Sequence, residues 1–143
     1  MRFNLIGSKK KKNQYDYNGF DGGTSKDVDA FCKAYNLDRS EITEFVLSDY
    51  IDVIDNYAFD GCDHLKSIVI PDGVHTIKLY AFANCKDLKT ITLPASLMTI
   101  ESSAFIDCIS LDTVEFRGTP EQFKAIKILG GNNDFKLAEV EYV

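Results

Sequence analysis

The stretch that decides the fold runs from residue 54 to residue 116 and states one pattern three times. Residues 54–76 read IDNYAFDGCDHLKSIVIPDGVHT, residues 77–99 read IKLYAFANCKDLKTITLPASLMT, and residues 100–116 read IESSAFIDCISLDTVEF. Seven columns of apolar residues recur at a spacing of 23 residues without an insertion. A period of this length is typical of repeat proteins, in which each unit buries its apolar face only against its neighbours.

Each unit contains a short strand that ends in a turn. In the first unit, Ile68 and Ile70 alternate with Ser67 and Val69, so the two isoleucines point inward and the other two side chains point outward. Pro71 has no amide hydrogen for a continuing strand, and Pro71-Asp72-Gly73 favours a turn. We therefore expect successive coils to stack in register, with the column Phe59, Phe82 and Phe105 filling the interior.

The repeat pattern resembles that of a known family. The motif I-x-x-x-A-F-x-x-C-x-x-L-x-x-I-x-I-P occurs at residues 54–71 and again at 77–94, and it resembles the BspA-type leucine-rich repeat. The resemblance covers residues 42 to about 117, because Ile42, Phe45 and Leu47 begin an incomplete unit. The third copy departs from the motif at Phe116 and Arg117, which indicates the approach to the end of the array.

The expected fold is an α+β repeat solenoid, a short right-handed leucine-rich-repeat stack with a parallel sheet on one face. Ser25 is expected to cap a helix that has an apolar stripe of Val28, Phe31, Cys32 and Tyr35, and this helix covers the first open end. The other end is covered by a helix and a strand. Thr119 caps that helix, in a capping box with Gln122 and with Pro120 at its first position, and residues 137–142 form the last strand.

Four segments follow from these assignments. They are a basic N-terminal segment with a hairpin (1–24), the N-terminal capping helix (25–41), the repeats (42–117) and the C-terminal cap (118–143). Met1 to Ile6 reads as a possible short strand. Residues 15–21 alternate aromatic and acidic residues around Asn18-Gly19, which favours a hairpin over a calcium loop because Phe20 stands at a ligand position.

Charge is distributed unevenly along the chain. The net charge is −6, yet residues 1–24 carry Arg2 and Lys9–Lys12 against only Asp16 and Asp21, so the rest of the chain is strongly acidic. An acidic body argues against nucleic acid or an anionic membrane as the main partner. The Lys9–Lys12 run is typical of a solvated arm.

No apolar run is long enough to cross a bilayer, and no signal peptide is evident at the start of the chain.

The cysteines are expected to be reduced. Cys62, Cys85 and Cys108 share one repeat column, so their side chains point the same way from coils about 4.8 Å apart, which does not suit a disulfide. A column along the stacking axis also fails to converge on a point, as zinc ligands must, and His64 and His75 supply no second close pair. We expect no metal and no cofactor.

The outward positions of the strands are the candidate binding site. They form two columns on one sheet face, namely Glu44, Ser67, Thr90 and Thr113, and Val46, Val69, Thr92 and Glu115. Regular faces of solenoids bind extended surfaces, although β-branched residues on a strand also simply favour strand structure.

No catalytic motif stands out, so we expect a non-catalytic protein-interaction module. There is no G-x-S-x-G motif and no phosphate-binding glycine loop. The family that the chain resembles consists largely of bacterial and protist surface proteins used in attachment, which implies adhesion or host-protein binding. The alternative is an intracellular interaction scaffold, favoured by the reduced cysteines and the lack of an export signal. We expect a monomer with a protein partner; the sequence leaves the location of the protein open.

Overall fold

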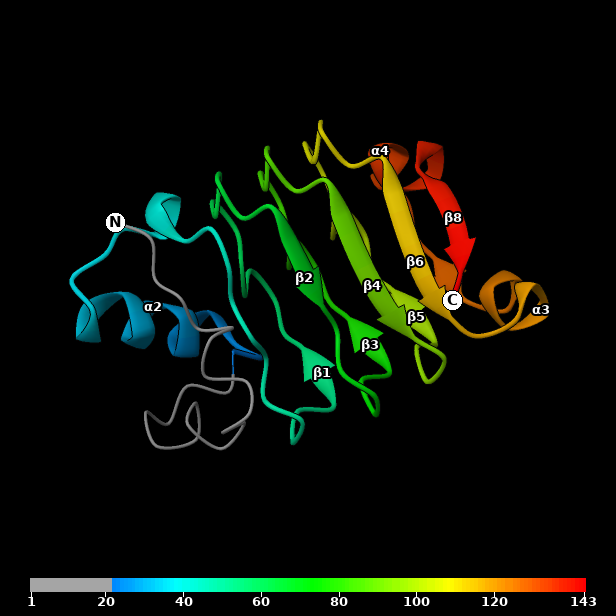
Figure 1. Ribbon diagram of the computed structural model, residues 1–143, viewed down its shortest axis with the longest axis horizontal. Helices are drawn as coiled ribbons and strands as arrows, with labels where there is room; N and C mark the ends of the chain where they lie inside the picture. The colour runs from blue at the N-terminus through cyan, green and yellow to red at the C-terminus, as the bar shows by residue number, and fades with distance from the viewer. Residues whose placement is uncertain (1–21) are drawn as a thin grey trace.

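The computed structural model describes residues 22–143, a stack of coils with a helix at one end and further elements covering the other (Figure 1). At the first end lie helix α2 (Ser25–Ala34) and the 3₁₀ helix η2 (Arg39–Glu41). The strands of the stack are β1 (Val53–Ile54), β2 (Ser67–Val69), β3 (Thr76–Ile77), β4 (Thr90–Pro94), β5 (Thr99–Ile100) and β6 (Thr113–Arg117). The closing elements are α3 (Pro120–Lys124), β7 (Lys127–Ile128), α4 (Asn133–Leu137) and β8 (Glu139–Tyr142).

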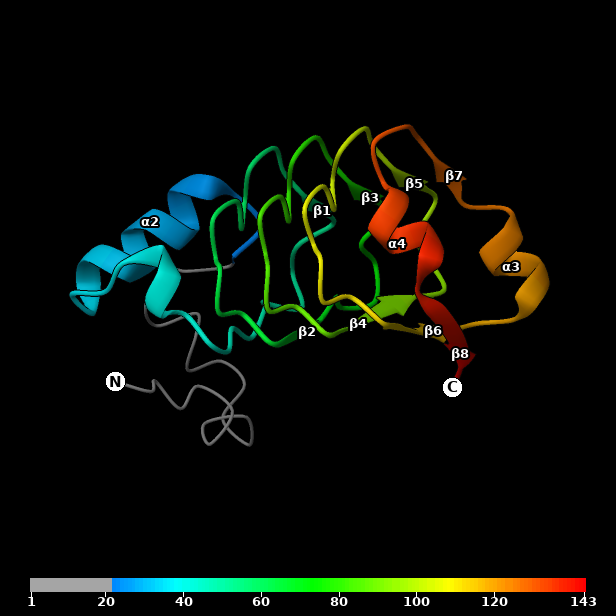
Figure 2. The ribbon, with the colours of Figure 1, turned by 90° about the horizontal axis from the view of Figure 1, so that it is seen from above.

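The strands form two parallel sheets rather than the one sheet expected from the sequence. One sheet has the order β1-β3-β5-β7 and the other the order β2-β4-β6-β8. They run along different sides of the stack (Figure 2). Each strand pairs with the strand of the next coil, and Ile54↔Ile77 and Ile68↔Ile91 are both 23 residues apart. The expected register is therefore confirmed, and the second sheet comes from the two-residue strands where each coil returns.

Aromatic rings stack through the centre of the molecule. The rings of Phe59 and Phe82 lie 5.2 Å apart and 2° from parallel, and those of Phe82 and Phe105 lie 5.3 Å apart and 5° from parallel. All three side chains are fully buried. Phe45 contacts Phe59 edge-on at one end, and Phe135 of α4 stacks on Phe105 at the other. Equivalent residues of successive coils thus stack on one another, and the incomplete first unit and the C-terminal cap each add one ring to the column.

The cysteine column bonds one coil to the next through its thiols. The Sγ of Cys85 donates to the carbonyl oxygen of Phe59 at 3.3 Å, and the Sγ of Cys108 donates to that of Phe82 at 3.0 Å. Cys62, Cys85 and Cys108 are free and fully buried. The cysteines thus form the expected column, and Cys85 and Cys108 donate weak hydrogen bonds along the stacking axis.

Each coil turns through left-handed backbone positions. Tyr57, Tyr80 and Ser103 have φ of 60°, 56° and 57°, and the next such column has φ of 79° at Gly61 and 60° at both Asn84 and Asp107. Glycine adopts this conformation without steric cost, and Asn and Asp tolerate it better than other residues. The Gly-Asn-Asp column therefore follows from backbone geometry. Tyr57 and Tyr80 instead stack their rings, with centroids 5.2 Å apart.

Arg39 closes the first end of the stack. In the interior, carbonyl groups of one coil accept from amides of the preceding coil, as Ala81 does from Phe59. The first complete coil has no such neighbour, and the Nη1 of Arg39 donates instead to the carbonyls of Ala58 and Asp60, at 3.0 Å each. The same guanidinium reaches α2 through Ser25 and Asp29. One side chain thus satisfies an exposed row of acceptors and fastens the capping helix.

Asn132 closes the opposite end of the stack, where backbone amides rather than carbonyls lack a neighbouring coil. Its Oδ1 accepts a hydrogen bond from the amide of Phe105 at 2.9 Å. In the preceding coil the equivalent amide, that of Phe82, donates to the carbonyl of Ala104. Its Nδ2 donates to the carbonyls of Glu101 and Leu129 at 2.9 and 2.8 Å. Asn132 is fully buried, so its amide group replaces a carbonyl of the coil that would come next.

Several local expectations require correction. The residue that caps α2 is Thr24, whose hydroxyl accepts from the Asp27 amide; Ser25 is the first helical residue. The last strand begins at Glu139, because Leu137 belongs to α4. The capping box of Thr119 and Gln122 is present as expected. The Met1–Ile6 strand, the Lys9–Lys12 arm and the hairpin over residues 15–21 lie outside the described residues.

Candidate functional site

The eight candidate residues fall on and beside the β2-β4-β6-β8 sheet. Ser67, Thr90 and Thr113 are register partners on three successive strands, and Val69, Thr92 and Glu115 form the second such row. Between these rows, Ile68, Ile91 and Val114 are buried in the core. The alternation of inward and outward residues is therefore as expected from the sequence.

The outward residues differ in accessibility. Ser67 is exposed and Val69 is 45% exposed, whereas Thr90, Thr113 and Glu115 are half-buried. Thr92 is only 8% exposed. Thr92 thus offers little surface to a partner, which the strand pattern alone did not indicate.

The C-terminal cap lengthens this face by one strand. β8 pairs with β6, so that Glu139 lies beside Thr113 and Glu141 beside Glu115. The spacing from Thr113 to Glu139 is 26 residues rather than 23, because α4 precedes the strand. A search at the repeat period does not find these two glutamates, yet they make the last edge of the face acidic.

The other candidate residues, Glu44 and Val46, lie in the extended segment 42–48, which the sequence assigned to the first, incomplete unit. Ile42, Phe45 and Leu47 are buried in the core as expected. Among the described residues, however, the backbone bond between this segment and β2 is that from the Lys66 amide to the Thr43 carbonyl, at 3.2 Å. The segment therefore runs beside β2 without joining its sheet.

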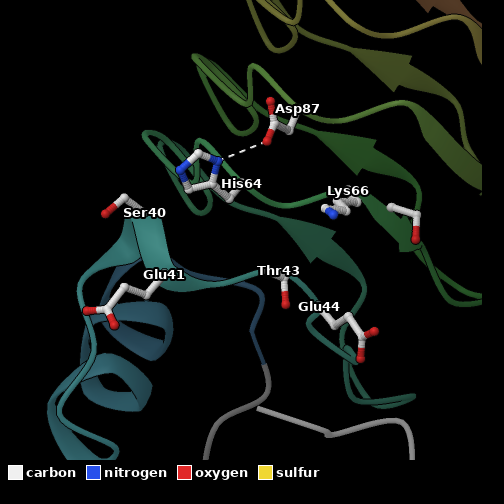
Figure 3. A pocket seen from close by; sticks show the side chains of 8 residues that line it. Ser40, Glu41, Thr43, Glu44, His64, Lys66 and Asp87 are labelled. Atoms are coloured by element: carbon white, nitrogen blue, oxygen red, sulfur yellow. Dashed lines mark hydrogen bonds and ion pairs between the residues drawn. The ribbon is translucent and has the colours of Figure 1, made fainter. Parts of the chain in front are cut away.

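Two hollows open where this segment separates from β2. The larger has a volume of about 920 Å³ and is lined by Ser40, Glu41, Thr43, Glu44, His64, Lys66, Ser67 and Asp87 (Figure 3). The second has a volume of about 520 Å³, and Glu44 and Ser67 line it as well. Its other lining residues are Phe45, Val46, Leu47, Asp49, Ile68, Val69, Pro71, Asp72 and Arg117. Four of the eight candidate residues, Glu44, Val46, Ser67 and Val69, thus line these hollows.

The larger hollow holds a histidine and carboxylate pair. The Nδ1 of His64 lies 2.9 Å from the Oδ2 of Asp87 (Figure 3). Asp87 occupies the position equivalent to His64 in the next coil, 23 residues further along the chain. A nucleophilic hydroxyl would need a hydrogen bond to the free side of the imidazole. Ser40 and Thr43 line the same hollow, but within residues 22–143 no hydrogen bond joins either hydroxyl to His64. The arrangement offers charges and hydrogen-bonding groups to a ligand rather than an activated nucleophile.

The thiols of the core are also unsuited to nucleophilic chemistry. Burial raises the pKa of the Cys62 thiol to about 12, although the charge of Arg39 opposes this shift. Interaction with the Cys108 thiol and burial raise the pKa of Cys85 well above its usual value. Because the thiolate is the reactive form, both thiols stay protonated and inert near neutral pH.

A search of the described part of the chain finds no group of three or more His, Cys, Asp or Glu side chains placed to hold a metal ion. Within residues 22–143, no helix has the length and apolar character needed to span a bilayer.

Comparison with known families decides the assignment of the repeats. The sequence model of the BspA type leucine rich repeat region, with six copies, matches residues 31–129. The chain belongs to the BspA-type leucine-rich repeat family. The family match begins inside α2 and ends after β7, so it extends on both sides beyond the residues 42–117 identified from the motif.

A solved structure is similar to this BspA-type chain. It is a leucine rich cell surface protein from Faecalibacterium prausnitzii A2-165, with 38% sequence identity and a TM-score of 0.46. The match covers 62% of this chain and 21% of that protein, so the chain corresponds to about a fifth of that protein's length. No curated protein matches the chain.

Proposed function

We propose that this chain is a non-catalytic protein-interaction module that binds its partner on the outer face of the β2-β4-β6-β8 sheet. The observation that carries the proposal is the alignment of Ser67, Thr90, Thr113 and Glu139 across four strands. The backbone of each strand pair is held in a parallel ladder, so the outward side chains have fixed spacing. A fixed, shallow surface suits a protein partner better than a small molecule, which is usually bound in an enclosed cavity.

The chemistry of the face favours a polar contact. Threonine hydroxyls occupy its centre, Val69 adds an exposed apolar side chain, and Glu115, Glu139 and Glu141 make the C-terminal part acidic. Complementary charge on the partner would guide docking and fix its register. We therefore propose a partner with a basic or hydroxyl-rich surface.

We further propose that the module acts in adhesion, by binding a protein of a host or neighbouring cell. Membership of the BspA-type family supports this role, because its members are largely surface proteins used in attachment. The second candidate is an interaction scaffold inside the cell. It is favoured by the four free cysteines, which are compatible with a reducing compartment.

Substitution of one sheet at a time tests the binding face. Thr90→Arg combined with Thr113→Arg places two large cations at the centre of the proposed face. Thr76→Arg combined with Thr99→Arg is a matched control, because these two half-buried threonines are register partners in the other sheet. Host and self lysates are passed over wild-type and both variant proteins, and the captured proteins are compared by quantitative mass spectrometry.

We expect a partner that is retained by wild-type protein and by the Thr76→Arg, Thr99→Arg control and lost by the Thr90→Arg, Thr113→Arg variant. Loss from the control alone would place the site on the β1-β3-β5-β7 sheet. Equal capture by all three proteins would remove both sheets as sites. Fractionation of the native cell separates the two roles, since recovery in the cytosol alone contradicts adhesion and recovery at the surface alone contradicts the scaffold.

A further inference from the structure

The β2-β4-β6-β8 sheet ends in an open strand edge at β8, its outermost strand (Figure 1). In a parallel ladder, alternate residues of a strand direct their backbone groups to opposite sides. The amides of Glu139 and Val143 donate towards β6 at 2.8 and 3.0 Å. Val140 and Tyr142 consequently direct their amide and carbonyl groups away from β6.

No described element pairs with this edge. Within residues 22–143, the backbone groups of Val140 and Tyr142 have no hydrogen-bond partner. The strand contains no proline, and its register with β6 is continuous, without a bulge. Proline and bulges are two devices that keep further strands from pairing with an edge. The edge of β8 is therefore a template on which an extended segment of another protein can add as a strand.

The outer side of the β8 edge is acidic. Glu139 and Glu141 are exposed, and Glu141 lies directly beside Glu115 of β6. In the part of the chain that the structure describes, none of these three carboxylates has a hydrogen bond or an ion pair. Like charges directly opposite each other on neighbouring strands are destabilising. A strand that carries lysine or arginine on this side would relieve the repulsion between Glu115 and Glu141.

The inner side of the same edge is apolar. The ring of Tyr142 contacts those of Phe116 and Phe123, with centroids 6.3 Å apart in each pair, yet 44% of Tyr142 is exposed. Val140 and Phe123 are half-buried, and Val143 is 64% exposed. Because side chains alternate between the two sides of a strand, an added strand would set apolar residues against this surface and its cations beside the glutamates.

A second copy of the chain fits this edge poorly. Two copies that paired β8 with β8 about a two-fold axis would place Glu139 and Glu141 of one copy beside the same two residues of the other. The acidic side of the edge would then gain further negative charge and no cation. Charge complementarity instead favours a basic partner.

We propose that the edge of β8 binds an extended segment of a partner protein in which lysine or arginine alternates with apolar residues, and that this segment adds as a fifth strand to the β2-β4-β6-β8 sheet. The proposal deepens the proposed function, because it rests on the chain being a protein-interaction module and names the kind of segment that it binds. Backbone hydrogen bonds supply affinity in this mode, and the alternating side chains supply specificity.

Amide hydrogen exchange with a defined peptide tests the proposal. The probe is the seven-residue peptide TKIKVKT, blocked at both ends, and its binding to the full-length protein is followed by NMR up to about 2 mM. At saturation we expect the Val140 and Tyr142 amides to exchange at least about tenfold more slowly. The amides of Glu141 and Ile91, which already lie within the sheet, should change less than about twofold. Absence of binding, or binding without this protection, would overturn the proposal.

Two further peptides separate strand addition from attraction between charges alone. The peptide TKKIVKT has the same composition and charge but does not alternate, so it cannot present its cations and its apolar residues to opposite sides. The peptide TEIEVET keeps the alternation and reverses the charge. We expect both to bind at least about tenfold more weakly than TKIKVKT. Equal binding of TKKIVKT would overturn the proposal, because it would show that charge suffices.

Reversing the charge of the edge should exchange the preferred peptide. With Glu139→Arg and Glu141→Arg, we expect TKIKVKT to bind at least about tenfold more weakly and TEIEVET to bind in its place. The matched control, Asp52→Arg with Asp72→Arg, changes two exposed carboxylates away from β8 and alters the net charge equally. It should bind TKIKVKT as wild type does. An equal loss in both variants would contradict a site at β8.

The remaining outcomes separate this proposal from others. Protection of Val140 that grows with protein concentration in the absence of peptide would identify a second copy as the occupant and would overturn the proposal. The peptide experiments use no lysate, so they are independent of the test of the outer face. A partner lost with Thr90→Arg and Thr113→Arg, combined with no binding of TKIKVKT, would remove the β8 site and leave the proposed function standing.

Discussion

The guanidinium of Arg39 donates a 3.0 Å hydrogen bond to the carbonyl oxygen of Ala58, and in doing so it replaces an amide of a coil that the described stack lacks. A stack of coils ends in backbone groups without partners, and an unsatisfied buried polar group is costly. Here the Arg39 side chain donates to the carbonyls of Ala58 and Asp60 in the first complete coil. It also bonds to the Asp29 carboxylate of α2. The first end of the repeat is therefore closed by side-chain chemistry as much as by the covering helix.

Removal of this guanidinium should loosen the first end. We expect Arg39→Leu to lower the free energy of unfolding by about 2–4 kcal/mol, because several carbonyls lose a charged donor in a side chain that is only 20% exposed. Arg39→Lys should recover little of this, since an ammonium group does not reproduce the planar fork of donors. Urea denaturation measures the change. Lys33→Leu, on the exposed face of α2, is the control and should stay within about 0.5 kcal/mol of wild type; an equal loss in both variants would contradict the assignment.

Asn132 should be equally important at the other end. It makes three hydrogen bonds while fully buried. Asn132→Ala removes the acceptor of the Phe105 amide and one donor each to the Leu129 and Glu101 carbonyls, of which Glu101 keeps the Ala104 amide. We expect a loss of about 2–4 kcal/mol in unfolding free energy. Asn132→Asp should be no better, because it keeps the acceptor but loses both donors. Asn133→Ala, at the exposed neighbouring position, serves as control; a stable Asn132→Ala protein would show that the end closes without this amide.

The core was predictable from the sequence because it repeats. Every interior column, from the phenylalanines to the cysteines, recurs at 23 residues, so three copies of one signal supported each inference. Arg39 and Asn132 each act once, at an end where the period stops, and no repetition marks them. The second sheet was missed because β1, β3, β5 and β7 have only two residues each, too few for an alternating pattern.

The candidate site was predictable only in part. Alternation along the strands correctly placed Ser67, Thr90 and Thr113 on the outer side of one sheet. The burial of Thr92 depends on the atoms that surround it in the fold, which strand alternation does not reveal. The acidic edge of β8 was missed because Glu139 follows its partner Thr113 by 26 residues rather than 23. The hollows beside β2 arise because segment 42–48 follows the repeat pattern in its core residues but not in its backbone bonds.

Removing the middle ring of the phenylalanine column should be severely destabilising. Phe82 is fully buried between two parallel rings, so Phe82→Ala removes contacts in both directions and leaves a cavity. We expect the unfolding free energy to fall by about 3–5 kcal/mol. Thermal and urea melts measure this, with Ile109→Ala as the control because Ile109 is 71% exposed. Wild-type stability of Phe82→Ala would mean that the column does not hold the core together.

Ionisation of Cys62 should make stability fall at alkaline pH. The thiol has a pKa of 9.0 in its unperturbed state and about 12 in the folded protein. Between these values the unfolded chain loses the proton and the folded chain keeps it, so the unfolded state gains stability as pH rises. The stabilising contribution is complete below pH 9 and is lost progressively towards pH 12.

The change is measured as a difference between two proteins, which cancels the titration of lysines and tyrosines. We expect the unfolding free energy of wild type, relative to Cys62→Ala, to decrease by up to about 1.4 kcal/mol per pH unit above pH 9. Alkylation at pH 8 should label Cys62 and Cys85 only after urea is added. A difference that stays constant from pH 8 to 11, or rapid alkylation of the native protein, would mean that the thiol column is open to solvent and does not lie between the coils.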